Sequence, residues 1–148
     1  MIGANHKGTV VTMVERKSGY AVLAKVANKT SELVSSAIVS NLKPLCERVK
    51  TLTFDNGKEF AAHRLIDQQL NSTAYFARPF ASWERGSNEN LNGLLRQYIP
   101  KKRSMSTVTD EEIRMIQNRL NNRPRKRLWF KTPDEVFHQS LKLVALRT

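Results

Sequence analysis

The sequence predicts an α/β fold. Two observations support this class: apolar residues repeat with strand-like spacing in some segments and helical spacing in others, and turn or capping residues separate those segments. The predicted order is strand, strand, helix, strand, helix, strand and then three helices. A chain of 148 residues is long enough to build one domain around a real core.

The first two strands are predicted to form a β-hairpin. Residues 8–14 are rich in Thr, Val and Met, residues 20–26 are apolar again, and the polar segment between them ends in Gly19. A helix follows, because Thr30 can cap it and Glu32 stands in its first turn. Five apolar residues at helical spacing predict its buried stripe: Leu33, Val34, Ala37, Ile38 and Leu42.

The middle of the chain alternates strands and helices. Residues 49–54 predict a strand, residues 58–70 a helix and residues 73–77 a short strand. Pro79 is expected to keep the loop that follows out of the sheet interior. The inner side of the helix is predicted to carry Ala62, Leu65, Ile66 and Leu70.

A helix is predicted over residues 87–98, and Pro100 stops it. Glu89 and Arg96 lie two turns apart on the face opposite its apolar stripe. A carboxylate and a guanidinium on one exposed helix face can serve a metal ion and a phosphate together. The stripe itself consists of Leu91, Leu94, Leu95 and Tyr98.

Two capping boxes predict the last two helices. Thr109 with Glu112 opens the first, and Thr132 with Glu135 opens the second. Pro133 at the first helical position supports the second start.

The composition indicates a polyanionic partner. The formal net charge is +12 and the pI is near 10.3, a balance typical of proteins that replace the counterions of nucleic-acid phosphates. A ribosomal-type or merely soluble basic protein is the competing interpretation. No long apolar run or signal-type start indicates a membrane partner. Cys46 is the only cysteine, so it forms no internal disulfide, and we expect it near the core.

Two carboxylates are the leading candidates for chemistry. Asp55 ends a predicted strand and precedes Asn56 and Gly57, and Glu89 stands at the start of a predicted helix. Such a pair suits two Mg²⁺ ions about a phosphate, where the ions stabilise the attacking and leaving oxygens. The competing interpretations are an Asp in a common turn and a Glu that complements the helix dipole. Zinc is excluded, because one Cys and three scattered His offer no ligand spacing.

Between Arg96 and Arg127 the chain carries ten Lys or Arg against three acidic residues. Residues 121–127 place four cations close to Trp129 and Phe130, which favours phosphate binding beside an aromatic surface. A solvated charged face is the alternative. The candidate DNA-binding residues are Arg96, Lys101, Lys102, Arg103, Arg123, Arg125, Lys126 and Arg127.

Several motifs resemble the catalytic core of bacterial insertion-sequence transposases, with the IS-thirty group as the best match. The resemblance covers nearly the whole chain, and the combination of motifs is very specific. The motifs are residues 53–60 (TFDNGKEF), 75–80 (YFARPF), 82–90 (SWERGSNEN), 92–98 (NGLLRQY), 121–127 (NNRPRKR) and 131–137 (KTPDEVF).

The resemblance implies an integrase-type core of the DDE transposases, with a ribonuclease-H-like fold and a mixed sheet flanked by helices. In that family two Asp and one Glu bind Mg²⁺ or Mn²⁺, nick DNA at element ends, and direct the freed 3′-hydroxyl to target DNA. The second Asp corresponds to Asp55, the Glu to Glu89 and a basic residue two turns later to Arg96. The implied partners are element-end and target DNA and other transposase subunits, in the bacterial cytoplasm at the nucleoid.

The family's first Asp lies on a strand just before a segment like residues 1–8. We therefore expect residues 1–148 to form a single integrase-type core that is incomplete at its N-terminus, with the first, central strand largely missing. Residues 100–148 form its basic helical C-terminal part. Metal binding by this chain is then expected to be weak or absent, and the chain to be inactive alone. An inactive DNA-binding remnant and a ribonuclease-H-like metal-dependent nuclease are the alternatives.

Overall fold

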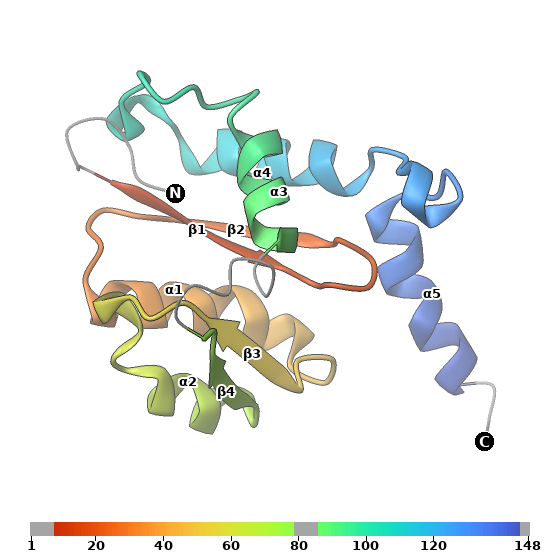
Figure 1. Cartoon of the computed structure of the whole chain (residues 1–148), viewed down its shortest axis with the longest axis horizontal. Coiled ribbons are helices and arrows are strands. Elements are labelled where there is room, and N and C mark those ends of the chain that lie inside the picture. The colour runs from red at the N-terminus through yellow and green to blue at the C-terminus, as the bar shows by residue number, and fades with distance from the viewer. Residues whose placement is uncertain (1–7, 79–85, 146–148) are drawn as a thin grey trace.

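The computed structural model describes residues 8–78 and 86–145, and its element order confirms the predicted one (Figure 1). Short 3-10 turns lie between several of the elements. The strands and α-helices are β1 (Thr9–Val14), β2 (Ala21–Val26), α1 (Ser31–Leu42), β3 (Thr51–Phe54), α2 (His63–Leu70), β4 (Thr73–Phe76), α3 (Gly86–Leu95), α4 (Asp110–Asn121) and α5 (Pro133–Ala145).

The four strands form two separate pairs. β1 and β2 are antiparallel, with Val11 opposite Ala24, and β3 and β4 are parallel, with Thr53 opposite Tyr75. Figure 1 shows α3 and α4 on one side of the hairpin, and α1, β3, β4 and α2 on the other. Antiparallel and parallel pairing therefore both occur among the described strands, but in two small separate sheets and not in one mixed sheet.

The hairpin is buried on both faces, because successive side chains of a strand point in opposite directions. Val10 packs with α3 and α4 in one cluster, and its neighbour Val11 packs with α1 in the other. The first cluster also contains Leu95 and Ile116, each at most 1% exposed, and the second contains Ile38. The hairpin is therefore the layer that joins two cores, and it fixes α3 relative to α1.

Side chains of α4 cap the outer edge of β2. The buried amide of Asn121 accepts a hydrogen bond from the Ala21 N–H at 2.8 Å and donates one to the Ala21 carbonyl at 2.8 Å. Gln117 Oε1 accepts from the Leu23 N–H at 2.8 Å. These side-chain amides bond to backbone groups that a neighbouring strand would otherwise pair with. They therefore protect the outer edge of β2 from pairing with another strand.

The predicted cap of α1 is confirmed: the Thr30 hydroxyl accepts from the Leu33 N–H at 3.4 Å. The box at α5 is complete, because Thr132 and Glu135 each accept the other's backbone N–H. At α4 only half of the predicted box forms. Thr109 accepts from the Glu112 N–H, but the Glu112 carboxylate turns away to Arg103.

Several predictions about burial and element bounds were wrong. Leu33 and Leu65 are 42% and 54% exposed, because each lies at the edge of its helix's apolar stripe rather than at its centre. Cys46 is exposed, since it follows a 3-10 turn (Lys43–Leu45) that lies outside α1. The helix predicted from residue 58 begins as a 3-10 turn over Lys58–Phe60, and α2 proper starts only at His63.

The predicted loop at Pro79 lies outside the described residues. No helix in the described ranges is long and apolar enough to cross a membrane.

Candidate nucleic-acid and metal site

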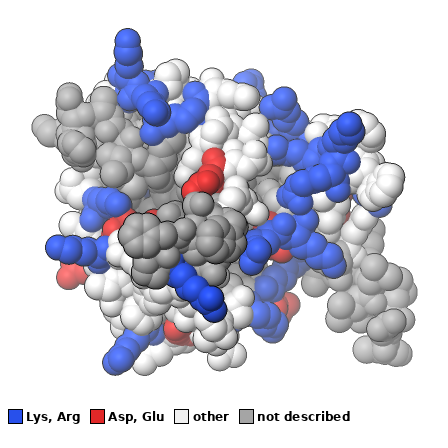
Figure 2. All heavy atoms as spheres, in the orientation of Figure 1, with Lys and Arg blue, Asp and Glu red and all other residues white. Residues whose placement is uncertain are grey.

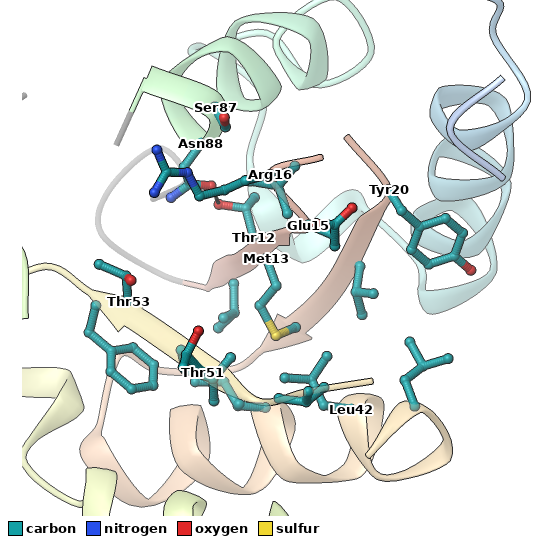
Figure 3. Close-up of a pocket in the computed structure, with 18 of the residues that line it drawn as sticks. Thr12, Met13, Glu15, Arg16, Tyr20, Leu42, Thr51, Thr53, Ser87 and Asn88 are labelled. Atoms are coloured by element: carbon teal, nitrogen blue, oxygen red, sulfur yellow. Dashed lines mark hydrogen bonds between the residues drawn. The ribbon is translucent and has the colours of Figure 1, made fainter. Parts of the chain in front are cut away.

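A cavity of about 390 Å³ separates the two strand pairs. Its walls come from β1 and from the segment that contains β3, and α1 contributes Ile38 and Leu42. Figure 3 shows Thr12, Ser87 and Asn88 on one side of this cavity and Thr51 and Thr53 on the other. The cavity therefore lies between β1 and β3, where two separately paired strands face the same space.

Asp55 lies on this cavity directly after β3 and is half-buried. Its position is fixed on both sides: the buried Phe54 carbonyl accepts from the Ala77 N–H at 2.8 Å, and Asn56 Nδ2 donates to the Ala77 carbonyl at 2.9 Å. These bonds tie the segment after β3 to the segment after β4. Asp55 is thus placed at the carboxyl end of a parallel pair, where α/β folds collect ligand-binding groups.

Glu89 lies in the first turn of α3 and is exposed. The opposite face of the helix is anchored by Leu91 and Leu95, which are 3% and 0% exposed. A polar contact adds to this anchor, because the Thr12 hydroxyl lies 3.0 Å from Asn88 Oδ1 and 3.1 Å from Asn92 Oδ1. The hydroxyl carries one proton, so it donates to one amide oxygen at a time.

Asp55 shares its cavity with Ser87 and Asn88, the two residues just before Glu89. Glu89 itself does not line that cavity, and the close approach of Asp55 and Glu89 stays a prediction. Within residues 8–78 and 86–145, no group of three or more His, Cys, Asp or Glu comes together to hold a metal ion. The donor chemistry of the pair nevertheless suits Mg²⁺ or Mn²⁺, which prefer carboxylate oxygens.

Two other carboxylates near this region already have partners. Glu15 accepts hydrogen bonds from the Ser18 hydroxyl and N–H at 2.6 Å and from the Lys17 N–H at 2.8 Å. Burial opposes ionisation of Glu15, but these bonds outweigh it and lower the pKa of the carboxyl. Glu59 pairs with Lys29 Nζ at 2.5 Å, and this contact lowers the pKa of Glu59 against the same effect of burial. Both residues are therefore poor substitutes for a metal ligand.

The predicted DNA-binding residues fall into two groups. Four of them, Lys101, Lys102, Arg123 and Lys126, are exposed, and so is Arg127, which also contacts the hairpin turn. Arg96, just after α3, is half-buried. Figure 2 shows that Lys and Arg side chains outnumber acidic ones on the face in view.

The remaining three predicted cations contact the protein itself. Arg103 makes a two-pronged salt bridge to Glu112, at 2.6 and 2.8 Å. Arg125 is half-buried and donates to the Leu120 carbonyl at 3.2 Å. Arg127 donates to the Lys17 carbonyl at 3.1 Å, in the turn of the hairpin. Sequence reasoning treated these residues as one basic tract and did not detect the inward contacts.

Trp129 and Phe130 form an exposed aromatic pair next to these cations. They are 89% and 72% exposed, and both have left-handed backbone angles, with φ of 55° and 63°. Bulky residues rarely adopt this conformation, so the surrounding loop must impose it. It does so through backbone hydrogen bonds that join Arg125 to Phe130 and to Lys131. These bonds hold the backbone of the loop, and both rings are exposed to solvent.

Sequence comparison relates the chain to insertion-sequence transposases. The transposase for insertion sequence element IS4351 from Bacteroides fragilis is 48% identical over 139 residues, covering 94% of this chain and 43% of the relative. Transposase InsI for insertion sequence element IS30A from Escherichia coli (strain K12) is 38% identical over 144 residues, which cover 97% of this chain and 38% of the relative. The chain thus spans about two fifths of the length of these relatives. No protein-family model matches the sequence.

Two solved integrase structures have a similar fold. The catalytic core domain of BIV integrase superposes with a TM-score of 0.68 at 22% identity, covering 97% of this chain and 93% of that one. A chain of the simian T-cell lymphotropic virus intasome, solved with PP2A regulatory subunit B56 gamma, also superposes with a TM-score of 0.68. The identity is 18%, and the match covers 88% of this chain and 52% of that one. At these identities the similarity establishes the fold, which is that of an integrase catalytic core.

Proposed function

Because this chain belongs by sequence to the IS-thirty group of insertion-sequence transposases, we propose that it supplies part of a DNA cutting and joining centre. In this proposal Asp55 and Glu89 are two of the carboxylates that act on a DNA phosphate, and exposed cations hold the DNA backbone. Element-end DNA, target DNA and further transposase subunits are its proposed partners. Among the described residues no third acidic side chain joins the pair, so the proposal assigns that ligand to another segment.

One observation carries the proposal. Asp55, at the end of β3, and the first turn of α3, which holds Glu89, border one cavity although they are distant in sequence. Two independent anchors hold them there: the bonds to Ala77 beside Asp55, and the Thr12 contact with α3. Asp55 and the helical turn that carries Glu89 thus border the same space, and we propose that the Glu89 carboxylate reaches the same metal ions as Asp55. Rigid supports of this kind are what a phosphate-transfer site requires.

Asp55 and Glu89 would hold Mg²⁺ or Mn²⁺, which would stabilise negative charge on the phosphate oxygens. The protein's own part is to bind and orient the DNA. Lys101, Lys102, Arg123 and Lys126 are exposed and basic, so their side chains can reach DNA phosphates. Trp129 and Phe130 offer faces on which unpaired bases can stack.

The test is a DNA nicking and strand-transfer assay with labelled element-end DNA and Mg²⁺ or Mn²⁺. It compares the 148-residue chain with a version extended upstream by a segment that contains an Asp. We expect activity only in the extended version, and we expect Asp55→Asn and Glu89→Gln to abolish it. Glu47→Gln and Glu111→Gln, both at exposed carboxylates, are the controls and retain activity.

Each outcome separates the alternatives. Nicking without joined products would favour a metal-dependent nuclease, and DNA binding without either product would favour an inactive remnant. Undiminished activity in Asp55→Asn or Glu89→Gln would overturn the assignment of that residue. Equal activity in the short and extended chains would show that the third ligand lies within the present sequence.

A further inference from the structure

A second cavity lies on α3 between the helix and the hairpin turn. Its volume is about 270 Å³, and its lining includes Gly19, Asn90, Leu94, Arg125 and Arg127. Two of these residues are cations, and the described part of the lining contains no carboxylate. The cavity is thus suited in charge to an anion.

Arg125 has a donor without an acceptor in the part of the chain that the structure describes. Its Nη2 donates to the Leu120 carbonyl at 3.2 Å, but its buried Nε has no hydrogen-bond partner among the described residues. Burial, followed by repulsion from Arg123 and Arg127, lowers the pKa of the Arg125 guanidinium. A buried donor without an acceptor costs free energy, and a nearby anion would remove both that cost and the repulsion.

Arg127 is held at this cavity by the hairpin turn. Its Nη1 donates to the Lys17 carbonyl at 3.1 Å, and its Nη2 occupies the space that a Cβ on Gly19 would need. Gly19 also has a φ of +75°, which other residues rarely adopt. The turn therefore has to carry a glycine for the guanidinium to lie against it.

From these contacts we propose that the cavity binds one phosphodiester group of DNA, with Arg125 and Arg127 as its donors. The inference rests on the proposed function, since it takes the anion to be the DNA backbone. Ser87 lines both this cavity and the one that Asp55 borders. A strand anchored here would run past the first turn of α3, which carries Glu89. The site would thus position the DNA for the carboxylates without touching the reacting phosphate.

The test places a carboxylate in the cavity. Asn90→Glu would supply an internal anion to both arginines, and Gln97→Glu makes the same charge change at an exposed position outside the cavity. Affinity for a labelled duplex is measured by fluorescence anisotropy over a range of NaCl concentrations. We expect Asn90→Glu to flatten the salt slope by about 0.9 more than Gln97→Glu, the value for one neutralised phosphate. Arg127→Gln should weaken binding little further in the Asn90→Glu background.

Equal slopes in Asn90→Glu and Gln97→Glu would overturn the phosphate site and leave the proposed function intact. Additive effects in the double variant would also overturn it, because Arg127 would then contact DNA elsewhere. Salt-independent or absent DNA binding by the unmodified chain would overturn both proposals. Inorganic phosphate is titrated at constant ionic strength as a separate arm. If it stabilises the chain in thermal unfolding while both variants bind DNA equally, the site holds a free anion and not DNA.

Discussion

Asn121 pairs with the backbone of Ala21 through two hydrogen bonds of 2.8 Å, accepting one from the N–H and donating one to the carbonyl. The side-chain amide has the same donor and acceptor arrangement as a peptide group. It therefore bonds to the edge of β2 as the backbone of a neighbouring strand would, although Asn121 belongs to a helix. Asn121 is only 3% exposed. This residue begins the basic motif at 121–127, and its role in the structure is to join α4 to the hairpin.

Asn121→Ala should lower the free energy of unfolding by about 2–4 kcal/mol, because it leaves the buried N–H and carbonyl of Ala21 without partners. Urea denaturation followed by circular dichroism measures this. Asn122→Ala, at the exposed neighbour, is the matched control and should change stability by less than about 1 kcal/mol. Similar destabilisation in the two variants would mean that the edge contact contributes little.

The stabilising contribution of Glu15, in the turn of the hairpin, should depend on pH. Its folded pKa is below the unfolded value of 4.5, so its stabilising contribution is present above that value and is lost as the pH falls through the folded pKa. The stability difference between the unmodified chain and Glu15→Gln should therefore shrink on acidification. Denaturation at a series of pH values measures it, with Glu47→Gln as control. A difference that grows at low pH would contradict the hydrogen-bonding account.

Exposed cations should set the salt dependence of DNA binding. Lys101→Gln with Lys102→Gln should flatten the slope of log affinity against log salt by roughly 0.9 for each DNA phosphate that these lysines neutralise. Lys43→Gln, at an exposed cation beyond the end of α1, should leave the slope unchanged. Should Lys43 matter as much as the pair, binding would depend on net charge alone.

Trp129 should serve binding rather than stability. Trp129→Gly relieves a left-handed backbone and removes a side chain that is 89% exposed, so the free energy of unfolding should change by less than about 1 kcal/mol. Binding to single-stranded DNA should weaken by about 1–3 kcal/mol if a base stacks on the ring, and Trp129→Phe should retain most of it. Unaltered binding by Trp129→Gly would remove this ring from the proposed interface.

The order of elements could be predicted because local signals specify it. Thr30, Thr132 and Pro133 mark helix starts by their own chemistry, and the predicted stripes of α1 and α3 contain the buried Ile38 and Leu95. Burial at the margins of a stripe could not be predicted, because it depends on which element covers each side. Leu33 and Leu65 are exposed for this reason.

The candidate site could be predicted only in part. Asp55 and Glu89 were recognisable from their motifs. The contacts of Thr12 with Asn88 and Asn92, which hold α3, span 76 and 80 positions of the sequence and leave no local signal. The sequence of the basic tract also does not show which of its cations pair with other side chains. Arg103 and Lys102 are neighbours in sequence, yet only the three-dimensional structure shows that Arg103 is paired with Glu112.

Paramagnetic broadening by Mn²⁺ is the sharpest test of a metal site shared by Asp55 and Glu89, because it detects even weak metal binding in the 148-residue chain. Amide NMR spectra are recorded as Mn²⁺ is added to the unmodified chain, to Asp55→Asn and to Glu89→Gln. We expect the signals of Asp55 and Glu89 to broaden together in the unmodified chain, and either substitution to suppress both effects. Broadening at only one of the two residues, or centred on other carboxylates such as Glu111, would contradict a shared metal site.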